Sequence, residues 1–198
     1  MALSGSANKR LVSALVSRGV SAVGLSGEDA ALLTAAPLDA AKLGCVGEPR
    51  RVNVALLRHL LDGGYLPVVS PLSRSDAAAA PAPAPASAAA APAALNVNGD
   101  DAAAVLAAAL EAEELLLVAD VAGVLVDGRV VPDLAPADAG RLIGGGAASG
   151  GMVAKLEAAL TALAGGVARV RIGDVSAIHD PTRGTIVSRE ASFTRSVA

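Results

Sequence analysis

The stretch GGGAASGGMVAKLEAALTALAGGVARVRIGDV (144–175) decides the fold. It begins with a glycine-rich loop and continues into residues 152–166, whose alanines, leucines and lysine favour a helix. Two glycines end that helix and lead directly into the Val/Ile-rich run 167–175, which is typical of a buried strand. A loop, a helix and a strand in this order predict one unit of an α/β fold.

The same step from helix to strand occurs three more times along the chain. The predicted helices cover residues 8–18, 51–61 and 100–112. The strands that follow them cover residues 21–27, 65–71 and, with its exit loop, 114–125. A short arm (129–134), a brief helix (135–143) and a last strand (184–189) complete the pattern. This alternation predicts an α/β fold with a mainly parallel sheet covered by helices on both faces.

Composition excludes several classes of protein. The 198 residues suit one domain of ordinary size, and we expect a single domain over 1–198. Aromatic residues make up 1% of the chain and the net charge is −3, which argues against binding of nucleic acid by base stacking or by a broad positive field. Charged residues or glycines interrupt each apolar run before the roughly 18 residues of a membrane span, so no membrane partner is expected. The first residues do not have the pattern of a signal peptide.

Cysteine and histidine carry no expected chemistry. Cys45 is the only cysteine, so no disulfide forms within the chain, and a reducing cytoplasm is the expected compartment. No Cys/His cluster has the spacing of zinc ligands, and we expect no protein metal site. His59 and His179 have no triad around them, so serine hydrolase and thiol chemistry are not expected.

One segment is compositionally distinct. Residues 77–94 read AAAAPAPAPASAAAAPAA. Proline at this frequency cannot sustain a helix, which predicts an extended, mobile loop without a catalytic role.

Lys155 is the first candidate for chemistry. Only three of the 16 basic residues are lysines, so a lysine kept in this position suggests a need for a compact ammonium group. It lies in the first turn of a helix directly after the glycine-rich loop 144–151. Such a loop and helix N-terminus suit a polyphosphate, although a flexible loop followed by a surface lysine is the alternative.

Two further segments combine polar residues with strand ends. In LNVNGDD (95–101), Asn96 and Asn98 alternate and so share a face, while Asp100 begins the next helix. These groups suit either the binding of a small acid or the capping of that helix. In VADVAGVL (118–125), Asp120 lies near the carboxyl end of a strand, where open α/β sheets bind ligands, although an ordinary turn has the same pattern. Neither a P-loop nor a GxGxxG fingerprint is present.

Together these segments resemble one known family. The matching segments, in order, are ALSGSANKRLV, AVGLSGEDAALL, LLRHLLDGGYLPVVSPL, LNVNGDDAAAVLAAAL, LLLVADVAGVL and SGGMVAKLEAALTALAGGVARVRIGD. They resemble the acetylglutamate kinases of the amino acid kinase superfamily over nearly the whole chain except the Ala/Pro segment. The resemblance implies a three-layer αβα sandwich. It also implies transfer of the γ-phosphoryl group of ATP, with Mg2+, to the side-chain carboxylate of N-acetyl-L-glutamate in arginine biosynthesis.

The resemblance also implies roles for individual residues. Lys155 corresponds to the lysine that stabilises the transferring phosphoryl group, Asp100 to the aspartate that holds active-site lysines in place, and Asn96 to the asparagine that binds acetylglutamate. The residues that correspond to nucleotide contacts are Asp120, Val121, Ala122, Gly123, Val124, Leu125, Ala147, Ala148 and Ser149.

The front of the family pattern has no counterpart in residues 1–198. Family members begin with a strand and a KxGG-type loop, followed by a second Gly-Gly loop and an arginine that binds the substrate carboxylate. We therefore expect an N-terminally truncated amino acid kinase fold, with nearly absent phosphoryl transfer by these residues alone. A sheet that lacks a strand exposes its edge and apolar helix faces, which favours a homo-oligomer, a dimer or higher.

Two other functions remain open from the sequence. One is a catalytically inactive, nucleotide-binding remnant that serves as an assembly subunit. The other is a sibling kinase that acts on aminoadipate or another amino acid. Retention of Asn96, Asp100 and Lys155 favours the acetylglutamate kinase over the inactive remnant, and the segment AVGLSGEDA is compatible with the sibling kinase.

Overall fold

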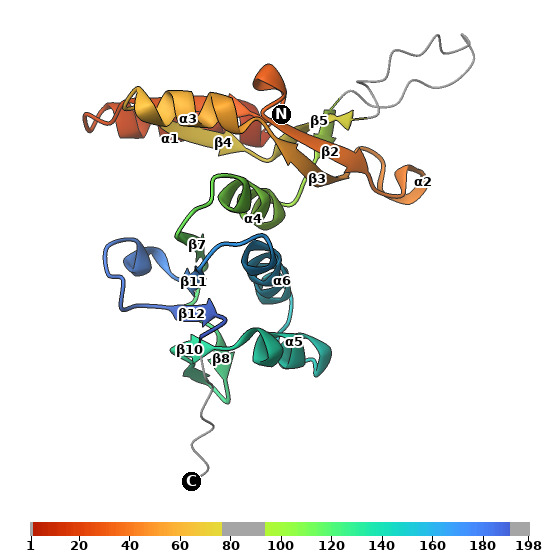
Figure 1. Ribbon diagram of the computed structural model, residues 1–198, viewed down its shortest axis with the longest axis vertical. Helices are drawn as coiled ribbons and strands as arrows, with labels where there is room; N and C mark the ends of the chain where they lie inside the picture. The colour runs from red at the N-terminus through yellow and green to blue at the C-terminus, as the bar shows by residue number, and fades with distance from the viewer. Residues whose placement is uncertain (1, 77–93, 191–198) are drawn as a thin grey trace. The chain divides into compact units, whose positions relative to one another are not determined.

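The computed structural model describes residues 2–76 and 94–190 (Figure 1). Contacts group the chain into two compact units, Met1–Ala102 and Ala103–Ala198, and the boundary falls inside helix α4 (Gly99–Ala109). The expectation of a single domain stays a prediction, and the Ala/Pro segment lies outside the described residues except for Ala94. Within the described ranges, no helix is long and apolar enough to cross a membrane.

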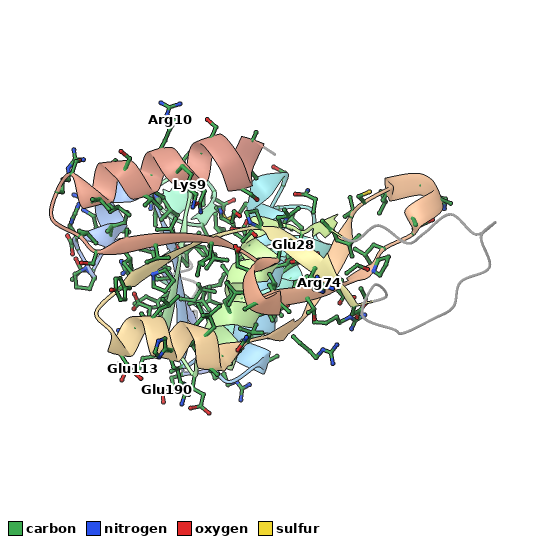
Figure 2. All side chains as sticks on the ribbon, turned by 90° about the horizontal axis from the view of Figure 1, so that it is seen from above. Lys9, Arg10, Glu28, Arg74, Glu113 and Glu190 are labelled. Atoms are coloured by element: carbon green, nitrogen blue, oxygen red, sulfur yellow. The ribbon has the colours of Figure 1, made fainter. Side chains whose placement is uncertain are left out.

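The first unit contains a helix–sheet–helix sandwich. Strands β1 (Ala22–Ser26) and β4 (Leu66–Ser70) pair in parallel. A short helical segment, η1 (Ala2–Ala7), leads into α1 (Asn8–Val16), which packs on both strands, and α3 (Val54–Asp62) packs on β4. Figure 2 shows α1 and α3 on opposite sides of this strand pair. The expected layering of helices over both faces of a parallel pair is therefore present here.

The side chain of Asn8 joins α1 to strands β1 and β4 by hydrogen bonds. Its side chain is 5% exposed, and its Nδ2 donates to the carbonyl of Val68 at 2.8 Å and to that of Leu25 at 3.4 Å. A Cβ added to Gly24 would overlap Asn8 Oδ1, so glycine at that position lets the helix approach the strand. One amide thus joins the helix to both strands.

A second sheet in the first unit curls on itself. Its order is β3 (Gly47–Val52), β2 (Leu33–Pro37), β5 (Leu72–Ser75) and β6 (Ala94–Asn96), and the short elements η2 (Asp29–Ala31) and α2 (Ala40–Leu43) flank β2. Asn96 forms a bridge with Val46, and its N–H donates to the carbonyl of Cys45 at 2.8 Å. The last strand therefore turns back towards the start of β3. The buried face combines small and large side chains, and Leu33, Ala35, Ser73, Ser75 and Leu95 are all fully buried.

The predicted helix over 51–61 is wrong at its start. Arg51 and Val52 belong to β3, and the helix begins at Val54. Asn53 caps it, because its side chain accepts a hydrogen bond from the N–H of Leu56 at 3.2 Å. An asparagine favours this capping position over the interior of a helix, and it separates the strand from the helix.

The second unit has one four-stranded sheet and one hairpin. The sheet order is β10 (Asp133–Leu134), β12 (Thr185–Ser188), β11 (Arg169–Gly173) and β7 (Glu114–Val118). Helix α6 (Gly151–Ala164) packs on β7 and β11, and α5 (Pro136–Gly144) packs on α6 and β12. The hairpin joins β8 (Leu125–Val126) to β9 (Arg129–Val130), and η4 (Val175–Ile178) follows β11. Ala158, Ala159 and Ala162 of α6 are fully buried in the core, which lets this helix lie close to the strands.

The α/β class is confirmed, and the strand pairings are mixed. Among the described residues, the pairings β1–β4, β2–β5, β7–β11 and β10–β12 are parallel, and β11–β12 is one of the antiparallel pairings. A parallel connection needs a crossover of a dozen or more residues, usually a helix. The short segment between β11 and β12 holds only η4, so β12 returns antiparallel to β11.

Candidate functional site

A pocket of about 480 Å³ lies in the second unit. It brings together three segments that are separate in the sequence: the exit of β7, the glycine-rich loop and the first turns of α6. The lining residues are Ala119, Asp120, Val121, Gly123, Val124, Leu125, Leu142, Ala147, Ala148, Ser149, Gly151, Met152 and Lys155. All the expected nucleotide contacts except Ala122 line this pocket, and Lys155 lines it with them.

The first wall is the segment that leaves β7. Strands β7 and β11 run parallel, and the segment starts at their carboxyl ends, where α/β sheets bind ligands. The N–H of Ala119 donates to the carbonyl of Gly173 at 2.7 Å, which ties the start of the segment to β11. The hairpin β8–β9 continues from its far end.

The second wall is the glycine-rich loop and the start of α6. Gly146 and Gly150 have φ values of +69° and +53°, a backbone region that favours glycine. No side chain in the described part of the chain caps α6, and no acidic residue lies in its first turn. The positive end of the helix dipole is therefore not neutralised there. Lys155, half-buried one turn into the helix, adds a full positive charge to the same wall.

The remaining lining residues are apolar and were not predicted as site residues. Leu142 comes from α5 and Met152 from the first turn of α6. Their helical spacing indicates a buried face but does not say whether that face meets the core or a ligand. Apolar walls with a few convergent polar groups are typical of a small-molecule site.

Asn96 and Asp100 lie in the first unit and do not line this pocket. Asn96 is exposed at the end of β6, and Asp100 lies in the first turn of α4. Asn98 provides the cap of that helix, since its Oδ1 accepts from the N–H groups of Asp100 at 2.8 Å and of Asp101 at 3.4 Å. The roles expected for Asn96 and Asp100 stay predictions.

The histidines and the cysteine form no cluster. His59, His179 and Cys45 are each exposed on different elements. Among residues 2–76 and 94–190, no group of three His, Cys, Asp or Glu side chains could hold a metal ion.

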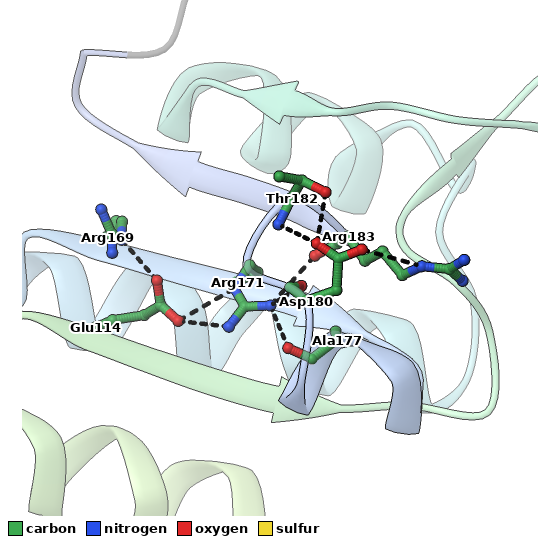
Figure 3. A network of polar contacts seen from close by, with 7 residues as sticks. All are labelled: Glu114, Arg169, Arg171, Ala177, Asp180, Thr182 and Arg183. Carbon is green, nitrogen blue, oxygen red and sulfur yellow. Dashed lines mark hydrogen bonds and ion pairs between the residues drawn. The ribbon is translucent and has the colours of Figure 1, made fainter.

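A network of charged side chains supports the sheet next to the pocket (Figure 3). Glu114 on β7 pairs with Arg169 at 2.6 Å and with Arg171 at 2.7 Å, both on β11. Burial acts to raise the pKa of Glu114, but the hydrogen bonds from Arg171 and Arg169 outweigh it and hold that pKa below its ordinary value.

Arg171 is the centre of this network. It is 5% exposed and also donates to the carbonyls of Ala177, Asp180 and Arg183. It thereby fixes the turn between β11 and β12. This role could not be predicted from the sequence, because an arginine within a strand of alternating side chains looks like a solvent-facing residue.

The chain matches the amino acid kinase family over residues 1–174. It is 45% identical over 182 residues to the acetylglutamate kinase of Chloroflexus aurantiacus. This alignment covers 91% of this chain and 66% of that protein. The chain is 40% identical over 193 residues to the acetylglutamate kinase of Geobacillus kaustophilus, covering 96% of this chain and 69% of that protein. The chain thus spans about two thirds of the length of these relatives.

A solved structure has the same fold. The protein smu.665 of Streptococcus mutans superposes with a TM-score of 0.78 at 26% sequence identity. The superposition covers 96% of this chain and 69% of the Streptococcus protein. The similarity to this structure therefore covers residues of both units.

Proposed function

The chain belongs to the amino acid kinase family, and from this premise we propose that it transfers the γ-phosphoryl group of ATP to the side-chain carboxylate of N-acetyl-L-glutamate. The acetylglutamate kinases that resemble it at 40 to 45% identity support this substrate. The product would be an acyl phosphate used in arginine biosynthesis. The observation that carries the proposal is the pocket in which the segment after β7, the glycine-rich loop and Lys155 meet.

The chemistry of the reaction explains why such a pocket is needed. A carboxylate that attacks a phosphoryl group brings negative charges together, so the barrier falls when positive groups are already in place. We propose that the N-terminus of α6 and Lys155 supply them in the second unit. Lys155 would stabilise the phosphoryl group during transfer, and the apolar side chains of Leu142 and Met152 would contact the nucleotide.

Magnesium would enter with the nucleotide. A Mg2+ ion in a phosphoryl-transfer site is held by one or two carboxylates and by the phosphates themselves. Asp120 is the carboxylate that lines the pocket and would supply a protein oxygen. The ion would neutralise charge on the phosphates during transfer.

The other roles are proposed from the family resemblance. Asn96 would bind acetylglutamate, and Asp100 would hold active-site lysines in place. A homo-oligomer is supported by Leu3, Leu11 and Val16 of η1 and α1, whose side chains are more than half exposed. The cytosol remains the proposed compartment.

The direct test combines binding and product formation. ATP binding to the purified chain is measured by calorimetry, and the acyl phosphate is trapped with hydroxylamine in a single-turnover assay with ATP, Mg2+ and acetylglutamate. We expect ATP to bind and hydroxamate to form slowly, and only with acetylglutamate. A chain that binds no ATP, or that phosphorylates aminoadipate equally well, would contradict the proposal.

The Asn96→Ala variant tests the substrate site. Asn96 and Cys45 are both exposed, and the backbone N–H of Asn96 donates to the carbonyl of Cys45, which carries the only thiol of the chain. We propose that an acid bound at Asn96 covers this thiol. We expect acetylglutamate to slow alkylation of Cys45 in the wild type, and the concentration for half protection to rise at least tenfold in Asn96→Ala. ATP affinity should stay within twofold of the wild-type value.

Asn98→Ser serves as the matched control, because serine also caps a helix and adds no charge near the bound acid. It should leave the protection of Cys45 unchanged. Equal loss of protection and ATP affinity in Asn96→Ala, or no loss of either, would indicate a structural amide.

A further inference from the structure

We propose that Thr185 is the positioning residue of the pocket segment 119–125. Its hydroxyl sets where Gly123, Val124 and Leu125 lie, and it thereby sets the affinity for nucleotide. This inference rests on the proposed function, because that function assigns the pocket to ATP. Thr185 does not line the pocket, so it would act through the backbone that it holds.

The Thr185 hydroxyl takes the place of one backbone hydrogen bond at the base of the hairpin β8–β9. Leu125 pairs with Val130, and Val126 with Arg129, so the register sets Val124 opposite Val131. The N–H of Val131 donates to the carbonyl of Val124 at 2.9 Å. The return bond runs through Thr185: the N–H of Val124 donates to Oγ1 at 2.8 Å, and that hydroxyl donates to the carbonyl of Val131 at 2.6 Å. One side chain from β12 is thus inserted at the base of the hairpin.

The backbone groups of Val124 and Val131 need the Thr185 hydroxyl because both residues are buried. Thr185 is fully buried, and Val124 and Val131 are 1% and 7% exposed. Solvent therefore has little access to the two backbone groups that the hydroxyl satisfies. A buried backbone donor or acceptor that loses its partner is strongly destabilising, so removal of the hydroxyl favours a shift of the hairpin base.

The pocket wall lies directly against this hydroxyl. A Cβ added to Gly123 would stand 2.8 Å from Thr185 Oγ1 and 3.2 Å from its backbone nitrogen. The other end of the segment is held by the bond from Ala119 to Gly173 on β11. The segment is therefore fixed at one end by β11 and at the other by β12, and Asp120 and Val121 between them line the pocket.

Substitutions of Thr185 separate the hydroxyl from the shape of the side chain. Valine has nearly the same shape without the hydroxyl, and serine keeps the hydroxyl without the methyl group. Thr161→Val makes the same chemical change on the exposed face of α6 and is the matched control. Binding of ATP to the full chain is measured by calorimetry, and thermal unfolding is recorded for each variant.

We expect the Kd for ATP to rise at least tenfold in Thr185→Val and to stay within threefold of wild type in Thr185→Ser. The control variant should stay within twofold. Thr185→Ala leaves room for a water that bridges Val124 and Val131, so its Kd should lie between those of the serine and valine variants. The alanine and serine variants keep the comparison possible if Thr185→Val does not fold.

Three results would overturn the inference. A lower melting temperature with wild-type ATP affinity in Thr185→Val, or in Thr185→Ala if the valine variant does not fold, would mean that the hydroxyl is structural only. Equal losses of affinity in the serine and valine variants would assign the effect to packing. Absence of ATP binding by the wild-type chain would overturn the proposed function itself, and this inference with it.

Discussion

Replacement of Lys155 by alanine is expected to lower the rate of acyl phosphate formation by a factor of about 100 to 1000. The ammonium group lies in the pocket wall, one turn from the N-terminus of α6. Negative charge concentrates on the phosphoryl group during transfer, so the lysine acts mainly on the transition state. The Kd for ATP should therefore change by less than about fivefold.

The measurement is single-turnover hydroxamate formation with excess protein, together with calorimetric ATP binding. Lys42→Ala is the matched control, since Lys42 is a surface lysine whose side chain is 82% exposed and paired with Asp39. Lys155→Arg keeps the charge but changes the geometry of the donor, so we expect only partial recovery. Wild-type turnover in Lys155→Ala would remove Lys155 from the catalytic machinery.

Much of the second unit could be predicted from the sequence, because its signals are local. The glycines before and after residues 152–164 mark both ends of α6, and the Val/Ile run that follows forms β11 as expected. The nucleotide segments were predicted through the family resemblance, and the pocket contains all of them except Ala122. Local turn and helix signals placed these segments on loops, where binding groups commonly lie.

The strands of the curled sheet could not be predicted in this way. β2 (LTAAP) and β5 (LSRS) are short, contain small or polar residues, and lack the apolar alternation of a strand with one buried face. They are strands because each pairs with neighbouring strands, including the parallel pairing of β2 with β5, and such pairing is set by the tertiary structure. Thr185 was missed for a related reason, since its partners Val124 and Val131 are more than 50 residues away in the sequence.

Disruption of the Glu114 network is expected to give the largest loss of stability. The side chain of Arg171 is 6% exposed, and Glu114 is the carboxylate that pairs with it. Arg171 is buried and Glu114 is partly exposed, so removal of the carboxylate should cost less than the roughly 3 to 5 kcal/mol of a fully buried ion pair. Glu114→Ala should lower the free energy of unfolding, measured with urea, by about 2 kcal/mol.

Matched variants identify the charge as the cause. Arg169 is 54% exposed and pairs with the same carboxylate, so Arg169→Ala should cost no more than about 1 kcal/mol. The double variant Glu114→Leu with Arg171→Met removes both charges, and we expect it to be more stable than Glu114→Ala, as for other buried pairs replaced by apolar side chains. A double variant less stable than Glu114→Ala would show that the contacts of Arg171 with the turn matter more than charge compensation.

The same pair makes stability depend on pH in a defined direction. The pKa of Glu114 is lower in the folded chain than its ordinary value of 4.5, so its contribution is fully present above that value. As the pH falls below 4.5 and through the folded pKa, the carboxylate is protonated and the contribution is lost. The difference in unfolding free energy between wild type and Glu114→Gln should be constant from about pH 6 to 7 and should shrink below about pH 4.5. A difference that stays constant down to pH 3 would mean that the carboxylate is not stabilised by the two arginines, since its protonation would then leave the stability of the sheet unchanged.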